Sequence, residues 1–332
     1  MRHKSGWTAG HYAPTMSQST KSIRWYGPLA FCVGALTALQ SRANGRLAIH
    51  LNNGVLAGLV SNVTGWVFLF AIVLCSPKDR ASFRRILRAS RHREIKVWEV
   101  LGGFGGAFFL AVQSSSVPVI GIALFTIGLV AGQTTSSLLV DKLGISPSGK
   151  KPITIMRVTT ALLTVTGVSI AVLPKLSQGT FDVLYIFLAF VIGIIVSFQQ
   201  AINGRLNVIA GRPLVTAWFN FAAGTVLLLV FLAINLVMGG KVGTLPLNPL
   251  LYAGGIIGLI FIAISAYTIK ELGVLNFIMF SVAGQVVTAL VVDAIAPAEK
   301  AHLSAWVIIG TLITFISVSI PKIHELVTKK RA

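Results

Sequence analysis

The sequence predicts an all-α integral membrane protein of about ten transmembrane helices, arranged as an inverted 5+5 repeat. Three observations support this fold class. Apolar runs of roughly 20 residues recur along the whole chain. Only 11% of the 332 residues are charged and 55% are hydrophobic, whereas a soluble domain carries roughly 25% charged residues. A polar string also appears twice at a constant offset.

The apolar runs and the breakers between them give ten expected helices. Each is long enough to cross the hydrocarbon core of a bilayer, and continuous runs of this length do not fit the short alternating strands of an outer-membrane barrel. Three of the connections, 51–53, 116–118 and 211–213, leave room for little more than a turn. The expected helices are 25–44, 54–75, 98–115, 119–140, 153–173, 182–203, 214–237, 250–269, 274–292 and 303–320.

The distribution of charge favours an orientation with both termini in the cytoplasm. The net charge is +19, and the basic residues gather between apolar runs, chiefly in Lys78–Lys96 and near the two termini. With the N-terminus inside, the inner segments hold 21 Lys and Arg residues and the outer loops hold 3, as the positive-inside rule requires. The partner expected from this pattern is the lipid bilayer, and no nucleic acid is expected.

The chain is expected to divide into four parts. Residues 1–24 form a disordered cytoplasmic tail, 25–173 the first five-helix repeat, 181–320 the second, inverted repeat, and 321–332 a basic cytoplasmic tail. The two cysteines are interpreted as buried small apolar residues without a disulfide framework.

Two sets of residues recur and define the repeat. Because each half has five helices, the second copy enters the membrane in the opposite direction, an arrangement that recurs in secondary transporters. It also occurs in channels, so a channel-like or structural membrane protein without a transport cycle is the alternative. At an offset of 159, Gly34, Gln40, Asn44, Gly45, Arg46, Leu47 and Gly65 recur as Gly193, Gln199, Asn203, Gly204, Arg205, Leu206 and Gly224. At an offset of 152, Gly102, Gly103, Gly106, Gly132, Gln133 and Asp141 recur as Gly254, Gly255, Gly258, Gly284, Gln285 and Asp293.

The sequence offers little for catalysis. It has no HExxH pattern, no Walker-type phosphate loop and no Gly-x-Ser-x-Gly, so we expect no enzymatic activity, no metal and no cofactor. No histidine or carboxylate falls in the middle of an expected helix. Because exporters of lipophilic cations usually use such a carboxylate, a neutral or anionic small-molecule solute fits better.

Six amide residues are the expected substrate-binding or gating groups. The first pair shares a helix face near the outer end of the first helix, and its repeat shares a face near the inner end of the sixth; Asn-Gly is expected to end each of these helices. Helix caps and interhelical hydrogen bonds are the alternative for these two pairs. The remaining two amides lie well inside the fourth and ninth helices and either line a cavity or bond a neighbouring helix. The six are Gln40, Asn44, Gln133, Gln199, Asn203 and Gln285.

Charged residues form a second group of candidates. Asp141, Arg157 and Asp293 are candidates for proton or charge coupling, because the two acids repeat and Asp141 could pair with Arg157 near the inner face; interfacial anchoring is the alternative. The arginines at the expected helix ends are interpreted as anchors that snorkel to the interface, with attraction of an anion as the alternative: Arg42, Arg46 and Arg205.

The doubled pattern of Gly, then Gln-x-x-x-Asn-Gly-Arg-Leu, then Gly-Gln and Asp resembles the YdcZ-like family of the drug/metabolite transporter superfamily, over residues 27–320. The resemblance implies a ten-helix bundle in the bacterial cytoplasmic (inner) membrane and an exporter role with no known substrate; a homodimer is left open. Gln40, Asn44, Gln199 and Asn203 match the family pattern.

The two halves depart from that pattern in different places. Asn62 stands where the family has Phe, and in the second half Asn220 stands where it has Ser. Asp141 is followed by Gly144, as in the family, but Asp293 is followed by Ala296. Trp306 is the counterpart of Arg157 in the second half. Asp141 and Arg157 are therefore not expected to have equivalents with the same role in the second half.

Overall fold

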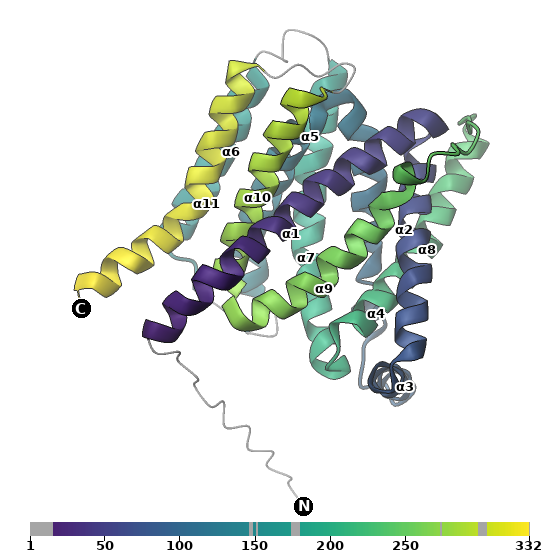
Figure 1. Ribbon diagram of the computed structural model, residues 1–332, viewed down its shortest axis with the longest axis horizontal. Helices are drawn as coiled ribbons and strands as arrows, with labels where there is room; N and C mark the ends of the chain where they lie inside the picture. The colour runs from purple at the N-terminus through teal and green to yellow at the C-terminus, as the bar shows by residue number, and fades with distance from the viewer. Residues whose placement is uncertain are drawn as a thin grey trace, which may run out of the picture.

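A computed structural model describes residues 16–145, 149–150, 152–173, 180–272, 274–297 and 304–331. This part of the chain is a bundle of helices without strands (Figure 1). The helices are α1 (Met16–Leu51), α2 (Gly54–Cys75), α3 (Pro77–Arg91), α4 (Val97–Val100), α5 (Gly103–Leu143), α6 (Ile155–Val172), α7 (Thr180–Ala210), α8 (Pro213–Val237), the 3-10 helix η2 (Pro249–Tyr252), α9 (Ala253–Leu272), α10 (Val274–Ile295) and α11 (Ala305–Arg331).

Seven stretches of the described chain are long and apolar enough to cross a membrane. α1 is not among them, because its second half carries several polar side chains, and the apolar part of α11, Ala305–Ile320, is shorter. The seven are Gly54–Cys75, Trp98–Leu143, Ile155–Val172, Asp182–Ala210, Pro213–Val237, Pro249–Ile269 and Phe277–Ile295.

The long helix α5 folds back on itself. Along its first part, contacts with α7 step backward through the α7 sequence, so the two run antiparallel. Along its last part, the contacts step forward, so they run parallel. The contacts are Gly102 with Asn203, Gly106 with Gln199, Gly128 with Ala189, and Gly132 with Gly193. Gly121, with a left-handed φ of 81°, breaks the helix just after Pro118, so α5 consists of two oppositely directed segments, 103–120 and 122–143. The turn expected at 116–118 is thus made slightly later.

The expectation that Asn-Gly ends two helices is wrong. α1 continues through Asn44 to Leu51, and α7 continues through Asn203 to Ala210. The left-handed residues that follow the true ends are Asn52 (φ 48°) and Gly211 (φ 67°), which are equivalent at the offset of 159. A helix that ended at the amides would leave backbone carbonyls unbonded inside an apolar bundle, which is costly, whereas α1 and α7 keep these carbonyls hydrogen-bonded for two further turns.

Two further expectations need correction, and one segment for which no structure was predicted is helical. α1 begins at Met16, within the expected disordered tail, so only residues 1–15 of that tail lie outside the described chain. The basic segment after α2 is helical, because Ser76 caps α3 and Pro77 occupies its first turn. Cys32 and Cys75 are exposed rather than buried, since the outer faces of membrane helices are themselves apolar.

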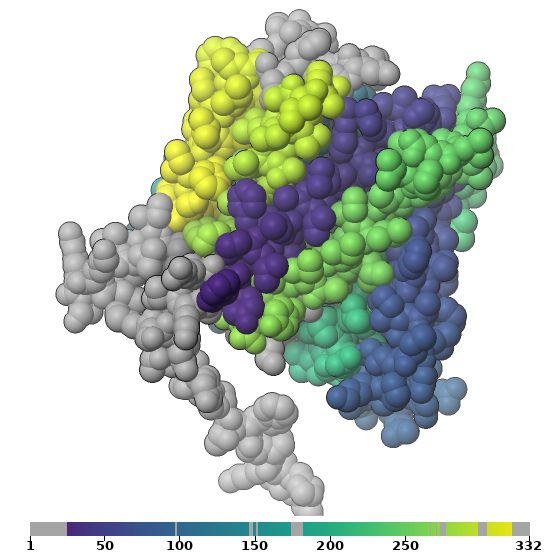
Figure 2. Space-filling model, in the orientation of Figure 1, coloured from purple at the N-terminus to yellow at the C-terminus, as the bar shows by residue number. Residues whose placement is uncertain are grey.

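Close glycine contacts join the two repeats reciprocally. In Figure 2, α1 runs between α9 and α10 of the second repeat. A methyl group at Gly34 of α1 would overlap the Ser281 carbonyl and lie 2.7 Å from the Gln285 nitrogen. Each of these close contacts between a residue of the first repeat and one of the second has a counterpart formed by the equivalent residues of the opposite repeats. The exchanged pairs are Gly34–Gln285 with Gly193–Gln133, Gly284–Phe31 with Gly132–Phe190, and Gly65–Gly255 with Gly224–Gly103.

Candidate functional site

The predicted residues Gln40 and Asn44 lie on α1 against the start of α9, in what we call the first amide cluster (Gln40, Asn44, Ser61, Gln113). A methyl group at Gly258 would lie 2.7 Å from Gln40 Nε2, and one at Gly254 would overlap Asn44 Oδ1. Only glycine allows these side chains to reach the α9 backbone so closely. The same Gly254 methyl would lie 2.9 Å from the Ser61 hydroxyl of α2.

Asn44 is fully buried and shares a hydrogen-bonded chain with α5. Asn44 Nδ2 donates to Gln113 Oε1 at 2.9 Å, and Gln113 Nε2 donates to the Ser41 hydroxyl at 2.8 Å. Asn44 Oδ1 and the Ser61 hydroxyl, although buried, have no hydrogen-bond partner in the described chain. Since an unsatisfied buried polar atom costs free energy, these two atoms are available to a polar ligand or water.

Gln199 and Asn203 form the second amide cluster with Asn220. A methyl group at Gly106 would lie 3.0 Å from Gln199 Nε2, and one at Gly102 would overlap Asn203 Oδ1 and lie 3.1 Å from Asn220 Oδ1. Both asparagine oxygens lack a partner within the residues described. The second cluster therefore repeats the first with α7, α8 and α5 in place of α1, α2 and α9.

The two clusters lie inside the bundle rather than at its mouths. Asn44 is about two turns, or roughly 10 Å at a rise of ~1.5 Å per residue, from the end of α1 at Leu51. Asn203 is equally far from the end of α7 at Ala210. The position expected for these amides, at helix termini, is thus wrong by two turns.

Gln133 and Gln285 do not join either cluster. Their backbone nitrogens lie next to Gly193 and Gly34. Gln285 is buried and Gln133 half-buried, and the described chain shows no side-chain hydrogen bond for either. Whether they line a cavity or bond a neighbouring helix therefore stays a prediction.

Asp293, near the end of α10, caps a segment of the other half. Its carboxylate accepts hydrogen bonds from the Ile122 nitrogen at 3.2 Å and the Ala123 nitrogen at 2.7 Å. These N–H groups follow the break at Gly121 and have no helical acceptor of their own, and a carboxylate is favoured at such a helix start. Asp293 is 6% exposed, so this capping role accounts for its burial.

Asp141 lies at the end of α5 and forms a salt bridge with Arg157 of α6, which confirms the expected pairing. Both side chains are partly exposed. They lie near the end of the first repeat. Among the described residues, neither forms a hydrogen bond or salt bridge with Asp293 or the amide clusters, so the structure does not unite the candidate coupling residues in one site.

The repeat-related arginines have different surroundings. Arg205 pairs with Glu99 at 3.1 Å and lies 5.5 Å from the centre of the Trp98 ring. Arg46 and Arg42 line a cavity at the other end of the bundle, and neither makes a salt bridge with a described carboxylate.

The basic helix α3 lies across one end of the bundle and is seen end-on in Figure 1. Its buried acid, Asp79, accepts hydrogen bonds from Arg212 Nε at 2.5 Å and Nη2 at 3.3 Å, in the turn between α7 and α8. These bonds, together with the Ser76 hydroxyl, hold the pKa of Asp79 below its usual value, and Asp79 in turn raises the pKa of Arg212. Ser82 also donates to the Ala210 carbonyl at 2.7 Å.

Gln113 is the main residue of the site that sequence analysis missed. It is fully buried and bonds both Ser41 and Asn44. A lone amide in the apolar run of 103–120 was a visible signal, but its repeat position holds Ser265, so a search for duplicated residues passes over it. The Glu99–Arg205 pair was also missed, because Leu251 takes the place of Glu99 in the second repeat.

Comparison with known proteins places this geometry in a family. A family model described as "Putative inner membrane exporter, YdcZ" matches residues 25–170 and again residues 184–320. A solved structure titled only "Crystal structure of protein" has a TM-score of 0.56 and 18% sequence identity, over 92% of this chain and 97% of its own, and so shares the fold. No curated protein matches. The chain is a multi-pass inner-membrane protein built from two matched repeats, and it belongs to the YdcZ-like family of the drug/metabolite transporter superfamily.

Proposed function

We propose that this protein is a secondary transporter that exports a small neutral or anionic solute across the bacterial cytoplasmic membrane by alternating access. Ten membrane crossings form two five-helix halves of opposite orientation, with both termini in the cytoplasm. The family to which the chain belongs is one of inner-membrane exporters, which supports the direction and the membrane.

The reciprocal glycine contacts support the inverted arrangement. Contacts in which each repeat exchanges roles with the other, such as Gly34–Gln285 and Gly193–Gln133, are those of two units related by a two-fold axis. An odd number of crossings in each half places that axis in the membrane plane. If the polar helix α3 and the four-residue helices α4 and η2 are left out and the two segments of α5 are counted separately, the described chain has five helices before residue 174 and five after it.

The observation that carries the proposal is that each amide cluster packs against glycines of the other half. Gln40 and Asn44 meet glycines of α9, while Gln199 and Asn203 meet glycines that precede or begin α5. A movement of one half against the other would loosen one cluster and tighten the other. Two related conformations, each open at a different end, follow from the two-fold relation, and the buried oxygens without partners would bind a solute between them.

Reporter tags test the inverted topology. Tags placed after Gly144 and after Pro174 should report opposite sides of the membrane, with the Gly144 tag in the cytoplasm. Finding both tags on one side would contradict the five-plus-five arrangement, since an odd number of crossings would no longer separate the repeats.

Metabolite profiling of cells with and without the protein tests the function. We expect at least one small solute to accumulate inside cells that lack the protein. Uptake of that solute into proteoliposomes should saturate and should slow in Gln40→Leu and Asn203→Leu, with Arg84→Gln on α3 as a surface control. An unchanged solute distribution across a broad panel argues against transport, and a flux that rises linearly without saturation indicates a channel.

A further inference from the structure

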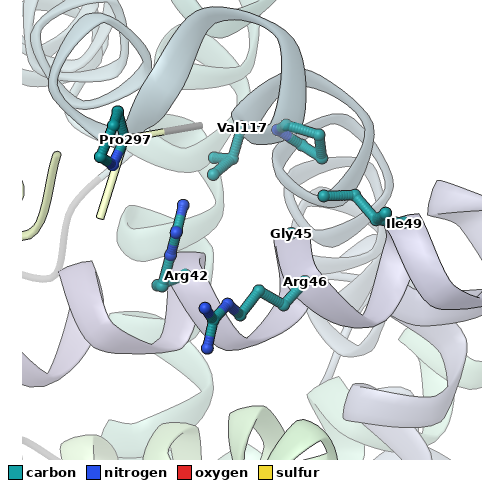
Figure 3. Close-up of a pocket in the computed structure, with 7 residues that line it drawn as sticks. Arg42, Gly45, Arg46, Ile49, Val117 and Pro297 are labelled. Atoms are coloured by element: carbon teal, nitrogen blue, oxygen red, sulfur yellow. The ribbon is translucent and has the colours of Figure 1, made fainter. Parts of the chain in front are cut away.

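A cavity of about 210 Å³ opens at the end of the bundle where α1 meets α2. Arg42, Gly45 and Arg46 line it from α1, Val117 and Pro118 line it from the α5 turn, and Pro297 closes it from the end of α10 (Figure 3). The two arginines rise from successive turns of α1, and the remaining walls are mostly apolar. This volume suits a small group with a few carbon atoms better than a drug-sized molecule.

No acid of the described chain forms a salt bridge with either guanidinium group of this cavity. Arg42 is half-buried, yet neither Arg42 nor Arg46 lies within salt-bridge distance of a carboxylate in the described ranges. The acid whose charge acts on Arg42 is Asp293, and both of its oxygens already accept hydrogen bonds from Ile122 and Ala123. Since a partly desolvated charge without a partner is costly, the cavity is suited to an anion.

The repeat-related arginine, Arg205, has a counter-ion. Arg205 is neutralised by Glu99 and stacks on Trp98. Around Arg46, the equivalent residue of the first repeat, the position of Glu99 is taken by Leu251. A second arginine, Arg42, occupies the position that is Ala201 near Arg205. Among the described residues, Arg46 thus has no salt-bridge partner like Glu99, and a second cation, Arg42, lies one turn away on the same helix.

We propose that Arg42 and Arg46 bind an anionic oxygen-bearing group, a carboxylate or a phosphate, at this end of the bundle. A guanidinium pair matches the planar, bidentate geometry of both groups. This assignment rests on the proposed transport function: if the protein is a transporter, the site predicts that its solute is an anion. The bound group comes either from a free solute or from a lipid headgroup.

Binding of radiolabelled inorganic phosphate and of acetate to the full-length protein tests this site. The protein is held in nanodiscs of neutral phosphatidylcholine, and only variants with an unchanged size-exclusion profile are compared. We expect saturable binding of at least one of the two anions, weakened about tenfold or more in Arg42→Gln/Arg46→Gln, because two charge-assisted hydrogen-bonding groups are lost. Arg84→Gln/Arg88→Gln removes the same charge from α3 and should bind like the wild type.

A second variant tests the site without removing the arginines. Leu251→Glu supplies Arg46 with the counter-ion that Glu99 gives Arg205, and it should weaken anion binding several-fold. Absence of binding to the wild type, or equal binding by the wild type and the double arginine variant, overturns the proposal.

Nanodiscs containing phosphatidylglycerol distinguish the two sources of the anion. If the headgroup is the ligand, this lipid abolishes phosphate binding and co-purifies with the wild type but not with the double variant. If a solute is the ligand, phosphate binding persists. Because none of these measurements requires transport, anion binding without any transported solute would contradict the proposed function alone. A transported solute without anion binding would contradict this site alone.

Discussion

Two short turns are equivalent in the repeat, one between α1 and α2 and the other between α7 and α8. Equivalent positions form the contacts of both turns, but the side chains at these positions differ. Asn53 donates to Asn235 Oδ1 at 2.7 Å and to the Lys241 carbonyl at 3.1 Å. Its repeat, Arg212, binds Asp79, which is equivalent to position 238 at the same offset of 159. In each half, the turn thus forms hydrogen bonds with the other half, at the end of its second helix or in the segment that follows that helix.

The difference between these turns follows the expected sides of the membrane. An ion pair and an arginine-rich amphipathic helix hold the turn on the side expected to be cytoplasmic, whereas neutral amides and an irregular loop hold the other. Positive charge is favoured on the cytoplasmic side, and an amphipathic basic helix lies well in the headgroup region. Duplication therefore preserves the backbone contacts, while the side chains adapt to the side of the membrane that each copy faces.

The largest expected effect is on the contacts that both halves share. Gly34→Val and Gly193→Val should each lower the stability by about 3 kcal/mol or more, because the new side chain overlaps the carbonyl of Ser281 or Leu129. Thermal unfolding of the purified protein in detergent measures this, with Gly27→Ala, which meets only the Phe280 ring, as the control. A large loss of stability at one position and a small loss at the other would contradict the equivalence of the two halves.

The amide clusters should respond unequally. Gln113→Leu leaves the buried Asn44 amide without its acceptor and should cost about 1–3 kcal/mol. The repeat-related change, Ser265→Ala, removes a hydroxyl with no partner in the described chain and should stay within about 0.5 kcal/mol. The same unfolding assay compares them, and equal losses would argue that the two clusters are held alike.

The neutral turn should lose stability independently of pH. Asn53→Ala removes the side-chain oxygen that accepts a hydrogen bond from the Leu56 N–H at the start of α2, and it removes both hydrogen bonds to the second half. It should lower the stability by about 1–2 kcal/mol. Asn53→Ser keeps a capping oxygen and loses the donated bonds, so it should fall between the alanine variant and the wild type. A strongly pH-dependent loss between pH 4 and pH 8 would show that a charged group contributes to this turn.

The charged turn should instead weaken in acid. Asp79→Asn should cost about 1 kcal/mol at neutral pH. Because Arg212 holds the pKa of folded Asp79 below that of the unfolded chain, the stabilisation is complete above the unfolded value of about 4. It is lost as the pH falls through the lower folded value. Unfolding curves of wild type and variant should therefore converge in acid, and a constant difference at all pH values would contradict this account.

Much of the architecture could be predicted from the repeat and the apolar runs, but not the helix ends or the pairing of side chains. The offsets of 159 and 152 located the glycines that bring the repeats together, because close backbone contacts tolerate no other residue. The helix ends predicted at Asn44 and Asn203 were wrong, because the tendency of Asn-Gly to end a helix is weaker than the need to keep backbone groups hydrogen-bonded in lipid. Gln113 could not be found by symmetry because Ser265 replaces it.

The carboxylate of Asp293 carries a consequence for biosynthesis. The amides of Ile122 and Ala123 leave the ribosome long before residue 293 is made, so the second segment of α5 stays uncapped until the end of α10 has entered the membrane. A first half produced by itself would keep these donors unbonded in the bilayer. A split gene would then yield a stable protein only when both fragments are synthesised in the same cell and meet in its membrane.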